Sequence, residues 1–213
     1  MPTETERRDT AAAYLRASAG TTARAADACE SSIIAAADVI VRAFRNNGKL
    51  LLCGNGGSAA DCQHMATEFV SRLTKTFERP ALPAVALTTD TSFLTAFAND
   101  CGFDGVFERQ VQALGRPGDV LVGISTSGNS PNVIRAVGAA RASGLRSIVL
   151  TGSGGVLGGL ADVAIAVPST DTQHIQEAHL AIEHLLCWLV ERELFPCQDA
   201  PPEEALAASE APR

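Results

Sequence analysis

The chain has 213 residues, of which 46% are hydrophobic and 19% are charged, and its formal net charge is −7. These values exclude a disordered chain and a broad nucleic-acid-binding surface, and the length suffices for one domain with a substantial core. No apolar run reaches the roughly 18–20 residues of a membrane span and no secretory signal is visible, so we expect a cytoplasmic protein without membrane contact.

The segment before residue 45 is rich in alanine and has apolar residues at helical spacing. Residues 1–10 are polar, and we expect them to lack regular structure. Residues 10–44 predict one or two amphipathic helices. These helices carry more apolar surface than one face of a sheet needs, which favours association of several copies. The apolar side chains concerned are Ile33, Ile34, Val39, Ile40, Val41 and Phe44.

After the helical segment, the sequence changes to short and nearly continuous apolar runs. There are five of them, at 49–53, 84–88, 119–125, 147–151 and 163–167. Helix-like stretches separate the runs, among them 57–73, 130–143 and 173–193. Strands that are apolar on both faces are typical of a parallel sheet covered by helices on both sides.

We therefore predict an α/β fold, namely a doubly wound five-stranded parallel sheet with helices on both faces and an N-terminal helical extension. We expect one domain over residues 1–197. Residues 198–213 contain four acidic residues and one Arg, which predicts an acidic flexible tail.

Small polar residues follow three of the predicted strands, at 54–58, 125–130 and 151–155. In open α/β sheets, ligands bind beyond the carboxyl ends of the strands. Residues 125–130 supply four hydroxyl groups, whereas capping a helix needs one, so this loop is interpreted as an anion-binding cradle. Neither glycine-rich loop has the Lys of a Walker A motif or the spacing GxGxxG. The predicted ligand is a small phosphate ester.

Candidate metal ligands occur on two predicted helices. His64 and Glu68 lie one helical turn apart and therefore share a face. Three of the four histidines fall within 174–184, together with Gln176. Nitrogen and oxygen donors of this kind suit zinc or another divalent metal. Gln176 and His184 lie about 12 Å apart on a straight helix, so long side chains converge, the helix starts after Gln176, or another subunit supplies a ligand.

Together these motifs resemble those of the phosphoheptose isomerases, members of the sugar isomerase (SIS) domain superfamily. The matching segments are 53–60, 63–68, 98–100, 118–130 and 172–179, together with His184. The resemblance covers about residues 25–195. It implies cytoplasmic conversion of sedoheptulose 7-phosphate to D-glycero-D-manno-heptose 7-phosphate through an ene-diolate, the first step of nucleotide-activated heptose biosynthesis. It also implies a homotetramer with active sites at subunit interfaces.

By matching position, the resemblance implies the residues of the site. Phosphate would be bound by Ser125, Thr126, Ser127 and Ser130. The sugar would contact Asn55, Gly56, Gly57, Glu68, Asn99, Asp100 and Gln176. One zinc ion per subunit would be held by His64, Glu68, Gln176 and His184. Glu68 and His184 would also move protons, which is the chemistry that displacement of a carbonyl group requires.

Other function classes remain as alternatives. A non-catalytic SIS-domain protein that binds a replication initiator would keep the loops and lack the acid–base pair, whereas Glu68 and His184 are both present. A sugar-phosphate-sensing regulator would need a DNA-binding module, for which the first 45 residues are too short and insufficiently basic. An isomerase of another sugar phosphate is the remaining alternative.

Overall fold

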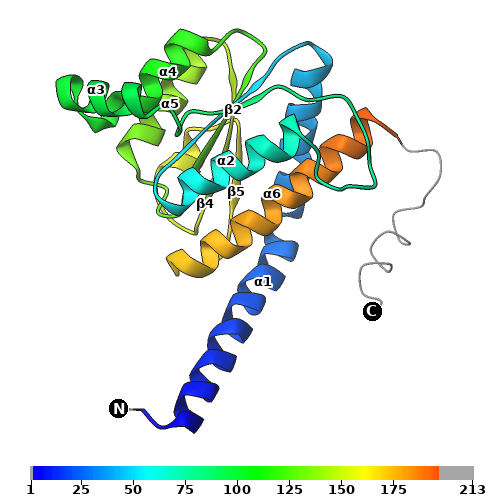
Figure 1. The fold of residues 1–213 in the computed structure, drawn as a ribbon, viewed down its shortest axis with the longest axis vertical. Helices are drawn as coiled ribbons and strands as arrows, with labels where there is room; N and C mark the ends of the chain where they lie inside the picture. The colour runs from blue at the N-terminus through cyan, green and yellow to red at the C-terminus, as the bar shows by residue number, and fades with distance from the viewer. Residues whose placement is uncertain (1, 197–213) are drawn as a thin grey trace.

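The computed structural model describes residues 2–196 as a parallel sheet between two layers of helices, with one long helix extending from it (Figure 1). The acidic tail predicted for 198–213 lies outside the described residues. The strand order is β2-β1-β3-β4-β5, and every neighbouring pair is parallel. The predicted fold class is therefore confirmed.

The strands coincide with the apolar runs that predicted them. They are β1 (Leu50–Gly54), β2 (Ala84–Ala86), β3 (Val120–Ser125), β4 (Arg146–Thr151) and β5 (Val163–Ala166). The α-helices are α1 (Glu4–Arg45), α2 (Gly57–Val70), α3 (Thr91–Cys101), α4 (Val106–Leu114), α5 (Pro131–Ala142) and α6 (Thr172–Leu194). Short 3₁₀ turns at Phe103–Gly105 and Leu157–Gly159 complete the connections.

Side chains of the central strands alternate between two cores. Leu50 and Leu52 of β1 lie in the core that also contains the buried faces of α1, α2 and α6. Leu51 and Cys53 lie in the core on the other face, against α3, α4 and α5. All of β1 and β3 is buried, which explains why both strands are continuously apolar in the sequence.

The N-terminal segment forms one helix, and its first turns extend beyond the rest of the fold (Figure 1). The expectation that residues 1–10 lack regular structure is wrong. Thr3 and Glu6 form a capping box, in which the Thr3 hydroxyl accepts from the Glu6 amide and the Glu6 carboxylate accepts from the Thr3 amide. No helix within residues 2–196, α1 included, has the length and apolar character of a membrane span.

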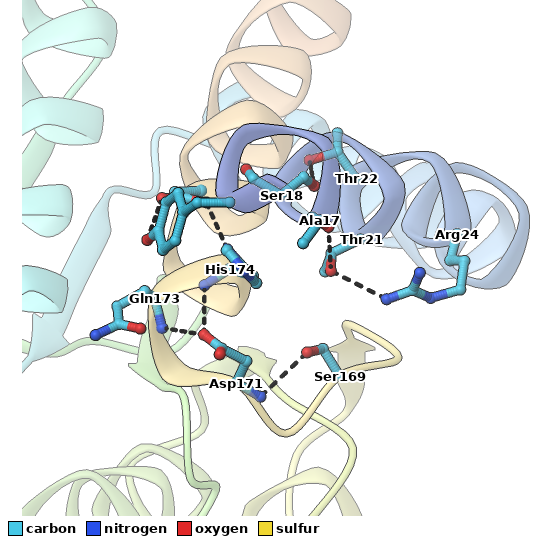
Figure 2. Close-up of polar contacts among 11 residues, drawn as sticks. Ala17, Ser18, Thr21, Thr22, Arg24, Ser169, Asp171, Gln173 and His174 are labelled. Carbon is cyan, nitrogen blue, oxygen red and sulfur yellow. Dashed lines mark hydrogen bonds and ion pairs between the residues drawn. The ribbon is translucent and has the colours of Figure 1, made fainter. Parts of the chain in front are cut away.

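Helix α6 starts at a capping residue, as Figure 2 shows. The Asp171 carboxylate accepts hydrogen bonds from the backbone amides of Gln173 and His174, at 3.0 and 3.1 Å. The His174 ring packs against Tyr14 of α1, with 4.7 Å between the ring centroids. Because the helix begins before Gln176, a start after that residue is excluded.

His179 attaches α6 to the end of β4. Its Nε2 donates a hydrogen bond of 3.1 Å to the carbonyl oxygen of Thr151, and the residue is fully buried. Its Nδ1 has no partner among the described residues. Burial lowers the pKa of His179 to about 4, although the bond to Thr151 acts in the opposite direction.

The lowered pKa of His179 predicts a loss of stability in acid. Between about pH 6.5 and pH 4, the unfolded chain protonates this imidazole and the folded protein does not, so acidification favours unfolding. A His179→Gln variant keeps an N–H donor for Thr151 and gains no proton. In urea unfolding, wild type should lose about 2 kcal/mol more than the variant between pH 7 and pH 4.5. Parallel pH dependences of the two proteins would contradict this account.

Candidate functional site

The site lies where the strand order reverses. From β1 the chain proceeds toward β2, and from β3 it proceeds toward β4, so the loops after β1 and β3 diverge from one another. Sheets of this order bind ligands in the crevice between these two strand ends. Residues 54–58 lead from the end of β1 into α2, residues 125–130 lead from the end of β3 to α5, and both segments are ones that the sequence singled out.

The hydroxyl groups of the loop 125–130 lie together. Ser125 Oγ is 2.9 Å from Ser130 Oγ and 3.4 Å from Ser127 Oγ. Ser130 occupies the N-cap position of α5, yet its side chain makes no capping hydrogen bond. The hydroxyls are therefore not engaged in starting the helix. Grouped hydroxyls at a helix N-terminus suit an anion such as phosphate.

The glycine-containing loop 151–155 packs against the loop 125–130. The amide of Gly152 donates to the carbonyl oxygen of Thr126 at 3.0 Å. Gly128 has a φ of 64°, and a Cβ there would collide with the carbonyl oxygen of Gly154. Glycine is thus needed for the close approach of the two loops.

An amide pair joins the two sides of the crevice. The side chains of Asn55 and Asn132 donate to one another reciprocally, each at 2.9 Å. Asn132 lies in the first turn of α5 and is 2% exposed. Sequence reasoning missed it. The available signal was a polar residue within the buried stripe that continues at Val133 and Ala136.

Three of the predicted metal ligands converge from α2 and α6. His64 Nε2 and His184 Nε2 are 2.7 Å apart, and the two rings meet edge to face at an interplanar angle of 78°. Glu68 Oε1 lies 3.7 Å from His64 Nε2. The prediction that His64 and Glu68 share a helical face is confirmed. His64 thus contacts both the His184 imidazole of α6 and the Glu68 carboxylate of its own helix.

This donor set fits zinc in its chemistry. At ordinary tetrahedral geometry, two nitrogen ligands lie about 3.3 Å apart, so the two rings would need to separate by about half an ångström. Within residues 2–196, no three His, Cys, Asp or Glu side chains are already arranged around a common point as ligands. Binding would therefore require small rotations of His64, Glu68 and His184.

Gln176 contacts the beginning of α2 instead of the two histidines. Its Nε2 donates to Asp61 Oδ2 at 3.2 Å, and a Cβ at position 57 would overlap its amide group. Gly57 is therefore needed for Gln176 to approach the loop. Burial raises the pKa of Asp61, although Gln176 and the nearby His64 act in the opposite direction. Gln176 therefore contacts α2 at Asp61, about one helical turn before His64.

No hydrogen bond within residues 2–196 joins the side chain of Asn99 or Asp100 to the segments 54–58 and 125–130. Both are exposed at the end of α3, and Asn99 Nδ2 donates to Asp100 Oδ1 at 2.8 Å. No residue of α3 is buried.

A buried carboxyl group adjoins His184 and was also missed. Glu183 is 1% exposed, and neither of its oxygens has a hydrogen-bond partner among the described residues. Burial, followed by the charge of Asp61, raises the pKa of Glu183 to about 9. Its side chain is therefore neutral at pH 7. A glutamate in the buried stripe of α6, one helical turn after His179, was the available signal.

Comparisons with known proteins identify similar chains. The family model of the SIS domain matches residues 13–152. The chain is 57% identical over 164 residues to a phosphoheptose isomerase of Roseiflexus sp. (strain RS-1), covering 76% of this chain and 82% of that protein. Against the phosphoheptose isomerase of Solidesulfovibrio magneticus, identity is 54% over 184 residues, covering 86% and 89% of the two chains. The solved structure of phosphoheptose isomerase GmhA from Neisseria gonorrhoeae is similar with a TM-score of 0.81 and 46% identity, covering 86% of this chain and 98% of that one.

Proposed function

Since the chain belongs to the phosphoheptose isomerases of the SIS domain family, we propose that it converts sedoheptulose 7-phosphate to D-glycero-D-manno-heptose 7-phosphate in the crevice between β1 and β3. This is an isomerisation at the start of nucleotide-activated heptose biosynthesis. The observation that carries the proposal is the meeting of His64 with Glu68 and His184 between α2 and α6, in a fold whose adjacent strand β3 ends in a loop of grouped hydroxyls.

The two loops would hold opposite ends of the substrate. The phosphate would receive hydrogen bonds from Ser125, Thr126, Ser127 and Ser130 and from the first amides of α5. The sugar would lie along Asn55, Gly56 and Gly57, with Gln176 on its other side, and Asn99 and Asp100 would complete its contacts. Because the phosphate is remote from the reacting carbons, its binding energy serves to orient the sugar.

The proton transfers follow from the chemistry of the carbonyl shift. One proton leaves C1 of the ketose and one arrives at C2, while a second proton moves between the two oxygens. The Glu68 carboxylate would accept the C1 proton, exchange it with solvent in a share of turnovers, and deliver a proton to C2. The His184 imidazole would carry the proton between the oxygens, because its nitrogen both accepts and donates. Both groups end in their starting protonation states, so the reaction balances without an oxidant or a reductant.

We propose one zinc ion per subunit, held by His64, Glu68, Gln176 and His184, and Gln176 would have to turn away from Asp61 to reach it. When bound, the ion would stabilise the negative charge of the ene-diolate. The donor types and the two facing imidazole nitrogens support this assignment.

We propose further that the protein works in the cytoplasm as a homotetramer with active sites at subunit interfaces. Large apolar side chains of α1 and α6 are exposed, namely Tyr14, Leu15, Ile34, Leu180 and Leu185. A second copy would cover them, and another subunit could bring Asn99 and Asp100 to a site. Sedimentation of a stable 22.1 kDa particle at micromolar concentration would contradict the tetramer.

Substitution of the proton-transfer groups tests the proposed function. Glu68→Gln keeps the shape of the side chain and removes the base, and His184→Gln removes the second proton carrier. With sedoheptulose 7-phosphate, each variant should lower kcat by about 10²–10⁴-fold and change KM little. Chelation should inactivate wild type, and zinc should restore it.

The matched control is the double variant Ser127→Ala/Ser130→Ala in the phosphate loop. Two lost hydrogen bonds to a charged group, each worth roughly 1.5–3 kcal/mol, should mainly raise KM. If Glu68→Gln and His184→Gln both stay within about tenfold of wild-type kcat, the acid–base assignment is wrong. If active protein contains no divalent ion, the zinc assignment is wrong and the acid–base assignment is unaffected.

A further inference from the structure

We propose that a buried ion pair, Arg79–Glu191, is a positioning device for the isomerisation. It fixes the last turn of α2, which carries Glu68, against the face of α6 that carries His184. The inference rests on the proposed function, because it assigns to the pair the alignment of the two proton-transfer groups.

Arg79 binds the end of α2 through its whole guanidinium group. Nη2 donates to the carbonyl oxygen of Glu68 at 2.7 Å, and Nη1 donates to that of Phe69 at 2.7 Å. Nη1 also donates to the carbonyl of Pro80 at 3.0 Å. The last carbonyl oxygens of a helix have no N–H donor within the helix, and a cationic side chain near them is stabilising. Arg79 therefore holds the very peptide unit from which the Glu68 side chain extends.

Glu191 connects this cap to α6. Its Oε1 accepts from Arg79 Nε at 2.8 Å and lies 2.7 Å from Nη2, and it also accepts from the amide of Leu73 at 3.2 Å. Glu191 follows His184 by seven residues, which is close to two helical turns, so both side chains project from the same face of α6. The contact thus runs from the face of α6 that bears His184, through Arg79, to the backbone of Glu68.

The burial of the pair indicates a role other than general stability. The two side chains are 1% and 3% exposed, and every guanidinium nitrogen of Arg79 donates, either to Glu191 Oε1 or to a backbone carbonyl. Buried ion pairs rarely contribute net stability, because desolvation offsets their attraction, and apolar residues of similar size often replace them without loss. What apolar residues cannot supply is directed hydrogen bonding to chosen carbonyls.

Fixing this turn matters because α2 ends at Val70, two residues after Glu68. Helix ends fray, and the residues that follow Val70 have no regular structure until β2. A frayed last turn would change the distance between Glu68 and the imidazoles. Misplacement of a reacting group by about 1 Å costs about 10²-fold in rate.

The test replaces both charges together, so that neither is left unpaired. Arg79→Met/Glu191→Leu should fold, with a Tm lower by roughly 5–10 °C, because neither charge is left unpaired but the carbonyls of Glu68 and Phe69 lose their donor. Its kcat with sedoheptulose 7-phosphate should fall at least about tenfold, while KM stays within about threefold, because the phosphate loop is untouched. The matched control is Arg45→Gln/Glu193→Gln, which removes an exposed ion pair between α1 and α6 and should leave kcat unchanged.

A folded Arg79→Met/Glu191→Leu protein with wild-type kcat overturns the inference. So does a loss of activity that merely equals the loss of folded protein. If this variant does not fold, Arg79→Lys decides, because lysine keeps the charge but carries its donors on one nitrogen, which cannot reproduce the contacts of three guanidinium nitrogens with Glu191 and the carbonyls of Glu68 and Phe69. It should lower kcat at least about fivefold at unchanged KM, and wild-type kcat overturns the inference. Failure of wild type to convert the substrate contradicts the proposed function itself, whereas equal conversion by wild type and variants contradicts only the positioning role.

Discussion

Parallel pairing of β1 with β3, from Leu50 opposite Val120 to Gly54 opposite Ile124, brings the ends of both strands to one edge of the sheet. The chain leaves β1 for α2 on one face and leaves β3 for α5 on the other. The two loops therefore separate just beyond the paired residues, and the Asn55–Asn132 amide pair spans them. Every other feature of the site depends on this arrangement.

The crevice divides the work between two sets of elements. The loop after β3 and the start of α5 present hydroxyls and amides, to which we assign phosphate binding without a Lys or Arg in the loop. The facing sides of α2 and α6 present two imidazoles and a carboxylate, to which we assign the proton transfers. Because His64 and Glu68 belong to α2 and His184 belongs to α6, the contacts that hold α2 against α6 determine how these three side chains are aligned. Among the ion pairs in residues 2–196, Arg79–Glu191 is the most buried.

Local patterns in the sequence predicted the parts of the structure that depend on neighbours in the chain. Continuous apolar runs predicted the five strands, and a spacing of four residues placed His64 and Glu68 on one face. The helical start at Glu4 was missed although Thr3 and Glu6 form a recognisable capping box. Contacts between distant segments had no such signal. Arg79 and Glu191 are 112 positions apart, and the approach of Gln176 to Asp61 depends on how α6 crosses α2.

The most direct measurement of the central claim, that a carboxylate on α2 takes and returns a carbon-bound proton, is proton NMR of sedoheptulose 7-phosphate turned over in deuterium oxide. If the base exchanges its proton with solvent, deuterium should appear at C2 of the aldose. As the reaction approaches equilibrium, it should also appear at C1 of the remaining ketose. Glu68→Gln should abolish both signals of exchange. Aldose formed by wild type with no deuterium at C2 after prolonged equilibration, or exchange by Glu68→Gln at the wild-type rate, would contradict the account.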